Sequence, residues 1–334
     1  MKAIWLFLVT VQLPMAGEAL PSGTGLAAGY PGDRGIKNDP RVIQVESFEQ
    51  SKTDQLISGW ESVKSAEDLS FSKDRPQRSG GEQSLLMDRK SGPGGSLYRR
   101  IKNSEGGFGY DQLFVRYYVK FAKDCGELHH FGTCLGGNHP ATPWPSVKAG
   151  VPTDGTNSFW SGIEPFGKSW TWDYYTYWCE MGGSPPRGQT WGNSFIHDPL
   201  LRVKKGEWIC IEQMIKMNKV GQSNGEQALW IDGKLVSHLG EGFPEGRWLF
   251  DKFQPRRGGE SVRWNQDKGK RDYFKVPEEG APFEGFRWRT SPKLNINFLW
   301  LYVYTEMPSG HRIKVWFDDV VVATEYIGPL VGKK

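Results

Sequence analysis

The chain has 334 residues, 42 Lys and Arg against 38 Asp and Glu, and a formal net charge of +4. This small excess does not indicate a nucleic-acid partner, and no stretch after the N-terminus is apolar for long enough to form a membrane helix. The 42 Gly and 21 Pro, with 15 Trp, 12 Tyr and 18 Phe, are typical of short strands joined by turns rather than of a helical bundle. We expect a monomer with no membrane partner.

The N-terminal residues have the pattern of a secretory signal. Lys2 precedes an apolar run of about ten residues, and small residues follow at Gly17 and Ala19. We therefore expect a signal peptide over residues 1–19 and a secreted or periplasmic protein. Residues 20–40 are rich in Gly and Pro and lack periodicity, which is typical of a linker. Residues 41–334 remain for a single domain.

Export would place the four cysteines in an oxidising compartment, where up to two disulfides can form. Of the three pairings that four cysteines allow, we expect Cys125 with Cys134 and Cys179 with Cys210. The first pair is close in sequence, and each member of the second lies near a predicted strand. No CxxC or Cys/His spacing indicates zinc.

The first long strand pattern is "QLFVRYYVKFA", over residues 112–122. Alternate positions from Leu113 onward are apolar, which predicts a face buried in the core. The opposite face carries Arg116, Tyr118 and Lys120, and we expect that face to meet a ligand.

Two adjacent histidines, His129 and His130, precede the stretch "FGTCLGG". Because successive strand residues point to opposite faces, only one of the two can face a given cleft unless a bulge intervenes. Imidazole titrates near neutral pH, so the histidine in the cleft can accept a proton or neutralise a carboxylate.

Further strand patterns follow toward the C-terminus. In "WTWDYYTYW", Tyr175 and Tyr177 share one face, and Trp172 lies on the other. The dipeptide Asp232-Gly233 between two strand patterns predicts a hairpin, because Gly adopts positive φ without strain. Many strands and hardly any helix predict an all-β fold, in which two antiparallel sheets pack as a sandwich with a concave groove.

The order of these motifs resembles a known enzyme family. The runs "HHFGTCLGG", "FWSGIEPFG", "DYYTYW", "GEWICIEQMIKMN", "LWIDGKLV" and "VWFDDVVVA" are together similar to the jelly-roll polysaccharide lyases of the alginate and glucuronan lyase type, which have a concanavalin-like fold. The resemblance implies one jelly-roll domain over residues 41–334. It also implies β-elimination on a uronate-containing, anionic polysaccharide, with no cofactor required.

The resemblance further implies site residues. Tyr175 and Tyr177 match the paired tyrosines of the family, as catalytic acid and base in an order left open. His129 or His130 stands where the family strand lines the cleft. The substrate-binding residues that we expect are Arg116, Tyr118, Lys120, Glu164, Lys168 and Trp172. Where the family strand often carries an arginine, "SGIEPFG" offers Ser161 and Glu164.

Elimination needs a group that neutralises the uronate carboxylate, a base for the adjacent proton and an acid for the departing oxygen. Tyrosine, with an ordinary pKa of about 10, can act as the base only beside a cation that lowers its pKa. The candidate cations are Arg116, Lys120, Lys168 and Arg187.

Two alternatives stay open. A glycoside hydrolase on the same fold would need two carboxylates across the scissile bond, and the candidates are Glu164, Asp173, Glu180 and Glu212. A non-catalytic carbohydrate-binding module would stack sugars on tryptophans, and the candidates are Trp160, Trp170, Trp172 and Trp178.

Two other segments carry charge. Asp318 and Asp319, with Glu46 and Glu49, are candidate oxygen ligands for a structural calcium where the first and last strands meet. The basic segment over residues 247–271 has interleaved aromatic residues, which predicts either a solvated loop or a wall for an anionic polymer.

Overall fold

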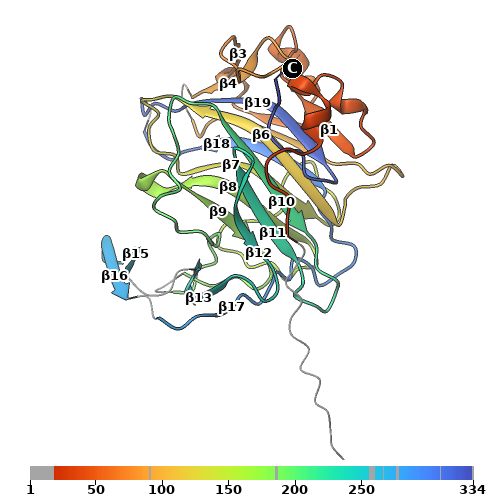
Figure 1. The fold of residues 1–334 in the computed structure, drawn as a ribbon. Coiled ribbons are helices and arrows are strands. Elements are labelled where there is room, and N and C mark those ends of the chain that lie inside the picture. The colour runs from red at the N-terminus through yellow and green to blue at the C-terminus, as the bar shows by residue number, and fades with distance from the viewer. Residues whose placement is uncertain are drawn as a thin grey trace, which may run out of the picture.

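The computed structural model describes residues 19–89, 92–184, 187–255, 260–265, 267–275, 278–308 and 310–332. All of the expected signal peptide except Ala19 lies outside the described residues. Figure 1 shows two packed antiparallel sheets, so the predicted all-β sandwich is confirmed. None of the helices described is long and apolar enough to cross a membrane.

The larger sheet contains eight of the described strands, in the order β12-β11-β10-β6-β19-β4-β3, with β1 paired to β19. Its strands are β1 (Val42–Glu46), β3 (Leu69–Ser72), β4 (Ser84–Asp88), β6 (Gln112–Phe121), β10 (Ile209–Lys216), β11 (Glu226–Ile231), β12 (Lys234–Leu239) and β19 (Lys314–Ala323). The predicted hairpin joins β11 to β12, and both turn residues, Asp232 and Gly233, have positive φ.

The smaller sheet contains six of the described strands, in the order β2-β5-β18-β7-β8-β9. Its strands are β2 (Ser62–Lys64), β5 (Ser96–Arg100), β7 (His130–Asn138), β8 (Ser158–Phe166), β9 (Thr171–Tyr177) and β18 (Phe298–Tyr304). Every pairing within it is antiparallel.

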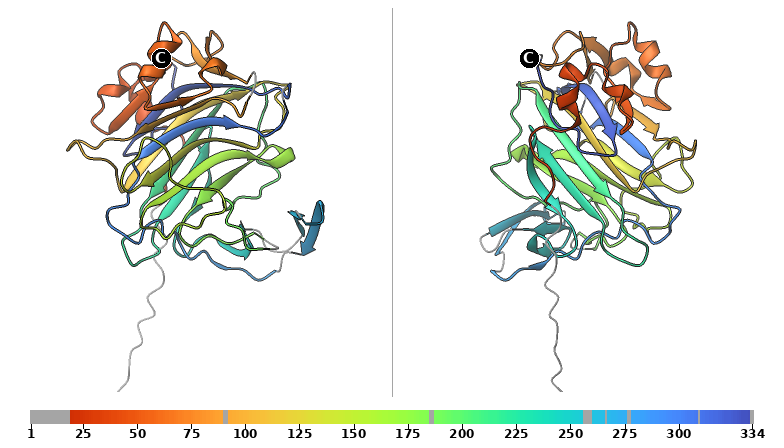
Figure 2. Two further views of the ribbon diagram at one scale, coloured as in Figure 1. Left: turned by 180° about the vertical axis from the view of Figure 1, so that it is seen from behind. Right: turned by 45° about the vertical axis from the view of Figure 1, so that its right-hand side comes forward.

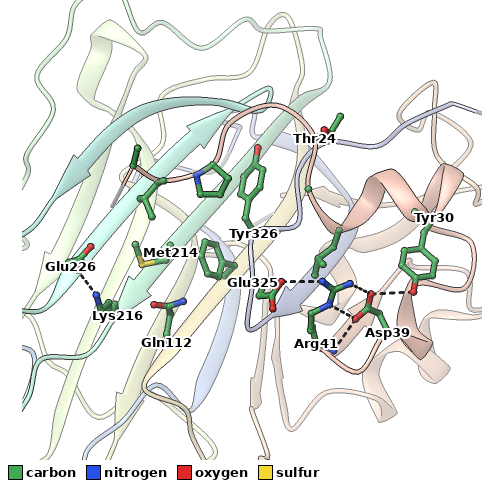
Figure 3. Close-up of a pocket in the computed structure, with 17 residues that line it drawn as sticks. Thr24, Tyr30, Asp39, Arg41, Gln112, Met214, Lys216, Glu226, Glu325 and Tyr326 are labelled. Atoms are coloured by element: carbon green, nitrogen blue, oxygen red, sulfur yellow. Dashed lines mark hydrogen bonds and ion pairs between the residues drawn. The ribbon is translucent and has the colours of Figure 1, made fainter. Parts of the chain in front are cut away.

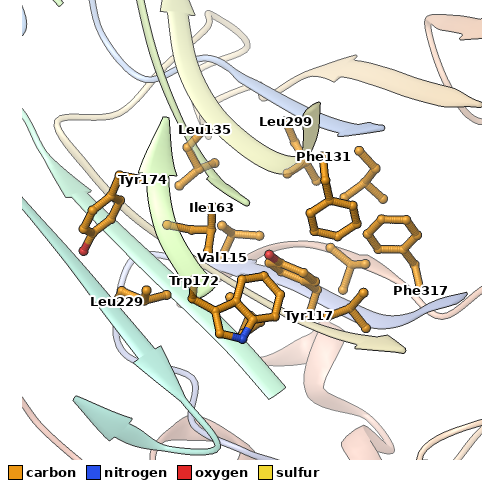
Figure 4. Packing of buried hydrophobic residues seen from close by; sticks show 14 of the residues in the cluster. Val115, Tyr117, Phe131, Leu135, Ile163, Trp172, Tyr174, Leu229, Leu299 and Phe317 are labelled. Carbon is orange, nitrogen blue, oxygen red and sulfur yellow. The ribbon is translucent and has the colours of Figure 1, made fainter. Parts of the chain in front are cut away.

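The core lies between the two sheets (Figure 4). Alternate residues of β6, such as Val115 and Tyr117, point inward, as the sequence pattern predicts. Phe131 of the smaller sheet stacks on Phe317 of the larger one, with ring centroids 5.4 Å apart. Trp172 is also buried in this core, so the outward face of β9 is left to Tyr175 and its neighbours.

Residues 20–40, expected to form a linker, instead pack on the outer face of the larger sheet. Leu26, Ala27 and Ile36 are buried against Phe114 and Trp230. The turns in this segment are η1 (Leu26–Gly29), η2 (Pro31–Asp33) and η3 (Ile36–Asn38). The segment is therefore part of the domain.

The predicted disulfides are wrong, because all four cysteines are free. Cys125 lies in the core, whereas Cys134 belongs to a cluster on the outward face of the smaller sheet. The Cys179 thiol donates to the Arg287 carbonyl, and Cys210 lies beside Tyr118 on the larger sheet. The four thiols thus lie in different parts of the domain, so neither predicted pair can form a disulfide.

The remaining elements lie outside the two sheets. Strands β13 (Glu245–Leu249), β14 (Lys252–Gln254) and β17 (Ala281–Pro282) form a small sheet, and β15 (Glu260–Asn265) pairs with β16 (Lys270–Lys275). Figure 2 shows this last hairpin at the edge of the sandwich. The helical elements beyond the N-terminal turns are α1 (Thr53–Ser58), η4 (Ala66–Asp68) and η5 (Gly167–Ser169).

Candidate active site

A groove of about 800 Å³ lies on the outward face of the smaller sheet. Its lining comes from strands β7, β8, β9 and β18 and from the loops around residues 144–149, 191–192 and 251. The described lining residues are His129, His130, Trp144, Pro145, Val147, Ala149, Trp160, Phe166, Tyr175, Tyr177, Trp191, Gly192, Asp251, Trp300, Tyr302, Tyr304 and Glu306.

Two glycines make room for the side chains of Cys134 and Tyr302 on the outward face of the smaller sheet. Both glycines lie on the same face as Cys134: Gly132 is two residues before it on β7, and Gly162 is its partner on β8. A Cβ at Gly162 would lie 2.6 Å from Cys134 Sγ, and one at Gly132 would lie 3.1 Å from both that sulfur and the Tyr302 ring. Larger residues would therefore displace the neighbouring side chains.

His130 is held between a carboxylate and an aromatic ring. Its Nδ1 lies 3.2 Å from Oε2 of Glu164, and its ring centroid lies 4.4 Å from that of Tyr175. Glu164 is only 5% exposed. A carboxylate at Nδ1 favours the tautomer with the proton on that nitrogen, which leaves Nε2 to accept another proton.

The two tyrosines predicted as catalytic residues form a hydroxyl pair. The Tyr175 and Tyr177 oxygens lie 3.2 Å apart, and the Tyr177 ring stacks on Trp160 with centroids 5.2 Å apart. Burial raises the pKa of Tyr175 well above its ordinary value, and burial likewise raises the pKa of Tyr177. Both hydroxyls are therefore protonated at neutral pH and are suited to donate a proton rather than to take one.

Both histidines line the groove, so the expectation that only one would face it is wrong. His129 precedes the first residue of β7 and is free of the strand alternation, and its ring centroid lies 4.5 Å from that of His130. Its Nδ1 is 3.5 Å from Glu306 Oε2. Burial, and next the neighbouring His130, lower the pKa of His129.

Aromatic side chains make up much of the groove wall. Trp300, Tyr302 and Tyr304 occupy alternate positions of β18, and Trp300 and Tyr302 stack with centroids 4.1 Å apart. Trp144 and Trp191 are contributed by loops. Such surfaces suit the apolar faces of sugar rings. Alternation in "FLWLYVY" could have identified the β18 residues, whereas nothing in the sequence marks the two loop tryptophans.

Of the predicted substrate-binding residues, Glu164 supports the site from beneath His130, but Arg116, Tyr118 and Lys120 were placed wrongly. They lie on the outer face of the larger sheet. The buried Arg116 guanidinium pairs with Asp33, the Tyr118 hydroxyl accepts the Leu330 N–H, and Lys120 Nζ lies 2.5 Å from Asp74.

The other two predicted contacts also lie away from the groove lining. Trp172 is 1% exposed in the core, and Lys168 is exposed in η5. Arg187, a candidate cation for a tyrosine base, pairs with Asp267 at 3.2 Å. Among the binding-module tryptophans, Trp160 lines the groove, but Trp172 and Trp178 are buried in the core and Trp170 packs against it.

The hydrolase candidate Asp173 is committed to the backbone. Its carboxylate accepts the N–H groups of Tyr174 and of residues 195–197 at 2.8–3.0 Å. His197 bridges it to Ser194 Oγ, at 3.4 and 3.1 Å. Ser194 is 3% exposed, and its N–H bonds to the Asp251 carbonyl. The N–H groups of residues 195–197 bond to Asp173, so the backbone here has no free N–H with which to stabilise an oxyanion beside Ser194. The chain of contacts is structural.

The other hydrolase candidates lie elsewhere. Glu180 pairs with Arg287 at 3.2 Å, and Glu212 is buried in the larger sheet, where it accepts the N–H groups of Ile327 and Gly328.

The candidate calcium ligands are divided between two surroundings. Glu46 accepts hydrogen bonds from Phe48 N and Trp60 Nε1, whereas Asp318 and Asp319 are buried near Arg116. Within the described ranges, no group of three or more His, Cys, Asp or Glu is placed to hold a metal ion. A structural calcium remains a proposal without support from this geometry.

A second cavity, of about 960 Å³, lies under the N-terminal segment on the larger sheet (Figure 3). Arg41 bridges Asp39 and Glu325 across one side of it, and the Lys216–Glu226 ion pair stands on the other. Its polar side chains are largely engaged with one another, whereas the smaller-sheet groove gathers the predicted acid–base residues. The smaller-sheet groove is therefore the candidate active site.

No protein-family profile and no curated protein matches the sequence. Solved structures do match. The PL-14 alginate lyase from Aplysia kurodai has a TM-score of 0.52 at 12% identity, covering 85% of this chain and 99% of that one. The alginate lyase vAL-1 from Chlorella virus has a TM-score of 0.49 at 13% identity, covering 84% of this chain and 100% of that one.

The endo-beta-1,4-glucuronan lyase from the fungus Trichoderma reesei has a TM-score of 0.41 at 13% identity, covering 85% of this chain and 95% of that one. The resemblance seen in the sequence is thus confirmed at the level of fold, since the chain has the jelly-roll sandwich of the Aplysia enzyme.

Proposed function

We propose that this protein is a polysaccharide lyase, which cleaves a uronate-containing chain by β-elimination in the smaller-sheet groove. One observation carries the proposal: the His130–Glu164 pair lies against the Tyr175–Tyr177 hydroxyl pair in an aromatic groove. A candidate base and a candidate acid thus lie side by side, as elimination requires.

His130 is the base in this proposal. Its Nε2 takes the C5 proton of the uronate, and the electrons of that C–H bond form the C4–C5 double bond. Glu164 stabilises the imidazolium that results, because its Oε2 lies 3.2 Å from Nδ1 and accepts the hydrogen bond of the Nδ1–H group. This assignment departs from the expectation that one tyrosine is the base, since no Lys or Arg lines the described groove to lower a tyrosine pKa.

Tyr175 is the acid in this proposal. As the C4–O bond breaks, the departing oxygen takes the Tyr175 hydroxyl proton. Tyr175 is the more exposed tyrosine of the pair and the one whose ring contacts His130. Tyr177 is 2% exposed, and its hydroxyl orients that of Tyr175.

The fold supports a uronate polymer as the substrate class, because the Aplysia kurodai protein of the same fold is an alginate lyase. We also propose export of the mature protein, on the sequence of residues 1–19 alone.

The test is incubation of purified protein with uronate polymers, followed by ultraviolet detection of unsaturated sugar ends. Wild type should produce them, and His130→Ala and Tyr175→Phe should not. Reducing ends without ultraviolet absorbance would overturn the proposal and indicate a hydrolase. Binding without cleavage would overturn it and indicate a carbohydrate-binding module.

A further inference from the structure

The groove offers little positive charge to an anionic substrate. None of the described residues that line it is Lys or Arg, whereas Asp251 and Glu306 line it and Glu164 lies behind His130. The only groups in the described lining that can become cations are His129 and His130. Since burial and the second imidazole lower the pKa of His129, that side chain is largely neutral at pH 7.

Two lysines contact aromatic rings of the groove wall from outside the lining. Lys64 Nζ lies 3.6 Å from the ring centroid of Trp144, and Lys252 Nζ lies 5.0 Å from that of Phe166. Neither lysine lines the groove. The space beside His130 and Tyr175 is therefore bounded by aromatic rings, apolar loop residues and carboxylates.

This environment disfavours a free carboxylate at the cleavage position. Removing the C5 proton from a uronate pushes negative charge into a group that already carries one, so the step is costly without a cation or several hydrogen-bond donors at the carboxylate. In an uncharged ester of the same uronate, the carbonyl accepts the C5 electrons without that repulsion. The ester alkyl group also suits an apolar wall such as Pro145 and Val147.

We propose that the groove cleaves uronate units whose carboxyl group is esterified, and that these uncharged units are its substrate class. This inference rests on the proposed lyase function. The balance of the elimination is unchanged: the C5 proton goes to the base, the C4–O bond breaks, and the departing oxygen gains a proton. The product is a 4,5-unsaturated uronate ester at a new non-reducing end.

The experiment compares matched polymers in the methyl-esterified and the free-acid form: alginate, glucuronan and galacturonan. Assays run near pH 6.5, because esterified uronates eliminate spontaneously in alkali, with no-enzyme and His130→Ala controls. We expect unsaturated ends to form at least tenfold faster from the esterified form of one polymer than from its free acid.

Equal or faster cleavage of the free acid would overturn this inference and leave the lyase function standing. No unsaturated ends from any polymer in either form would overturn the lyase function itself, and this inference with it.

A charge variant gives a second readout. Glu306→Gln removes a groove carboxylate with little change of shape, and it should narrow the preference for the ester by about twofold to threefold. Glu105→Gln, at an exposed turn outside the groove lining, is the matched control and should leave the preference unchanged. An unchanged preference in Glu306→Gln would contradict the electrostatic explanation.

Discussion

At the scale of single residues, the two histidines of the groove are held in different ways. His130 is fixed by Glu164 at Nδ1 and by the Tyr175 ring at its face. His129 has a looser environment, because its side chain is 45% exposed and its acidic partner, Glu306, is 67% exposed. The two adjacent histidines are therefore held differently, although both line the groove.

His130→Ala should reduce kcat by about a hundredfold to ten-thousandfold, the range for loss of a general base. His129→Ala should reduce it less than about tenfold, because that residue contacts substrate without taking the proton. Initial rates from ultraviolet absorbance provide the comparison, and circular dichroism confirms folding. Equal, mild effects would mean that neither histidine is the base.

Tyr175→Phe should also reduce kcat by about a hundredfold or more, since only the hydroxyl that donates the proton is lost. Tyr177→Phe should have a smaller effect, because its hydroxyl acts through Tyr175 at 3.2 Å. Parallel kcat and KM measurements separate the two roles. A larger loss in Tyr177→Phe than in Tyr175→Phe would reverse the assignment.

At the scale of elements, the loop after β9 positions Tyr175, the proposed acid. Asn193 exchanges backbone hydrogen bonds with Thr176, and its side chain accepts the Trp178 indole N–H. Gly192 thereby packs against the Tyr175 ring, where a Cβ would lie 2.5 Å from ring carbons. The absence of a side chain at this position permits the Tyr175 orientation.

Gly192→Ala should therefore lower kcat by about tenfold or more while the protein still folds, because the new methyl group displaces Tyr175. Gly29→Ala is the control, since a Cβ there has no neighbour within 4 Å. Kinetics for both variants, with thermal unfolding as a check, test the effect. Full activity in Gly192→Ala would show that the groove tolerates a shifted tyrosine.

The N-terminal segment is a second element with a defined attachment. Asp33 of η2 pairs with Arg116, whose side chain is fully buried on β6. Asp33→Asn would leave the guanidinium charge buried without its partner, and it should lower the free energy of unfolding by about 3 kcal/mol. Denaturant unfolding beside the exposed control Asp54→Asn measures this, and a change below about 1 kcal/mol would mean that the segment contributes little.

At the scale of the whole molecule, buried acids of the larger sheet link stability to pH. Burial raises the pKa of Glu212 from 4.5 to about 7. The folded state thus binds more protons than the unfolded state between these values, so this group's contribution to stability falls as pH rises from about 4.5 to about 7.

Relative to Glu212→Gln, which does not titrate, the wild type should therefore lose up to roughly 3 kcal/mol of unfolding free energy across that range. Denaturant unfolding of both proteins at pH 5 and pH 8 tests the sign. A difference that stays constant or moves the other way would show that Glu212 is ionised throughout.

The fold could be predicted because strand alternation is a local property. Leu113, Val115 and Tyr117 point to the core as their spacing indicates, and Tyr175 and Tyr177 share the groove face. The burial of Arg116 beneath the N-terminal segment could not be predicted from strand alternation, because it depends on where a segment distant in sequence packs. Periodicity shows that two faces differ, but it does not show which of them stays open.

The residues that lie together in the groove could be predicted in part, for the same local reasons. His130, Glu164, Tyr175 and Tyr177 meet because β7, β8 and β9 are neighbours in the sheet. The loop residues Trp144 and Trp191 carry no periodic signal. The four free cysteines show the limit of sequence proximity, since Cys125 and Cys134 lie in different layers.

The most direct test of the central claim is to incubate the purified protein with the esterified and free uronate polymers and with neutral glucans, recording both ultraviolet absorbance and reducing ends. Both signals should rise together on a uronate polymer, and both rates should fall by at least about a hundredfold in His130→Ala. Reducing ends without absorbance, or a rate in His130→Ala close to that of the wild type, would contradict the proposed lyase function.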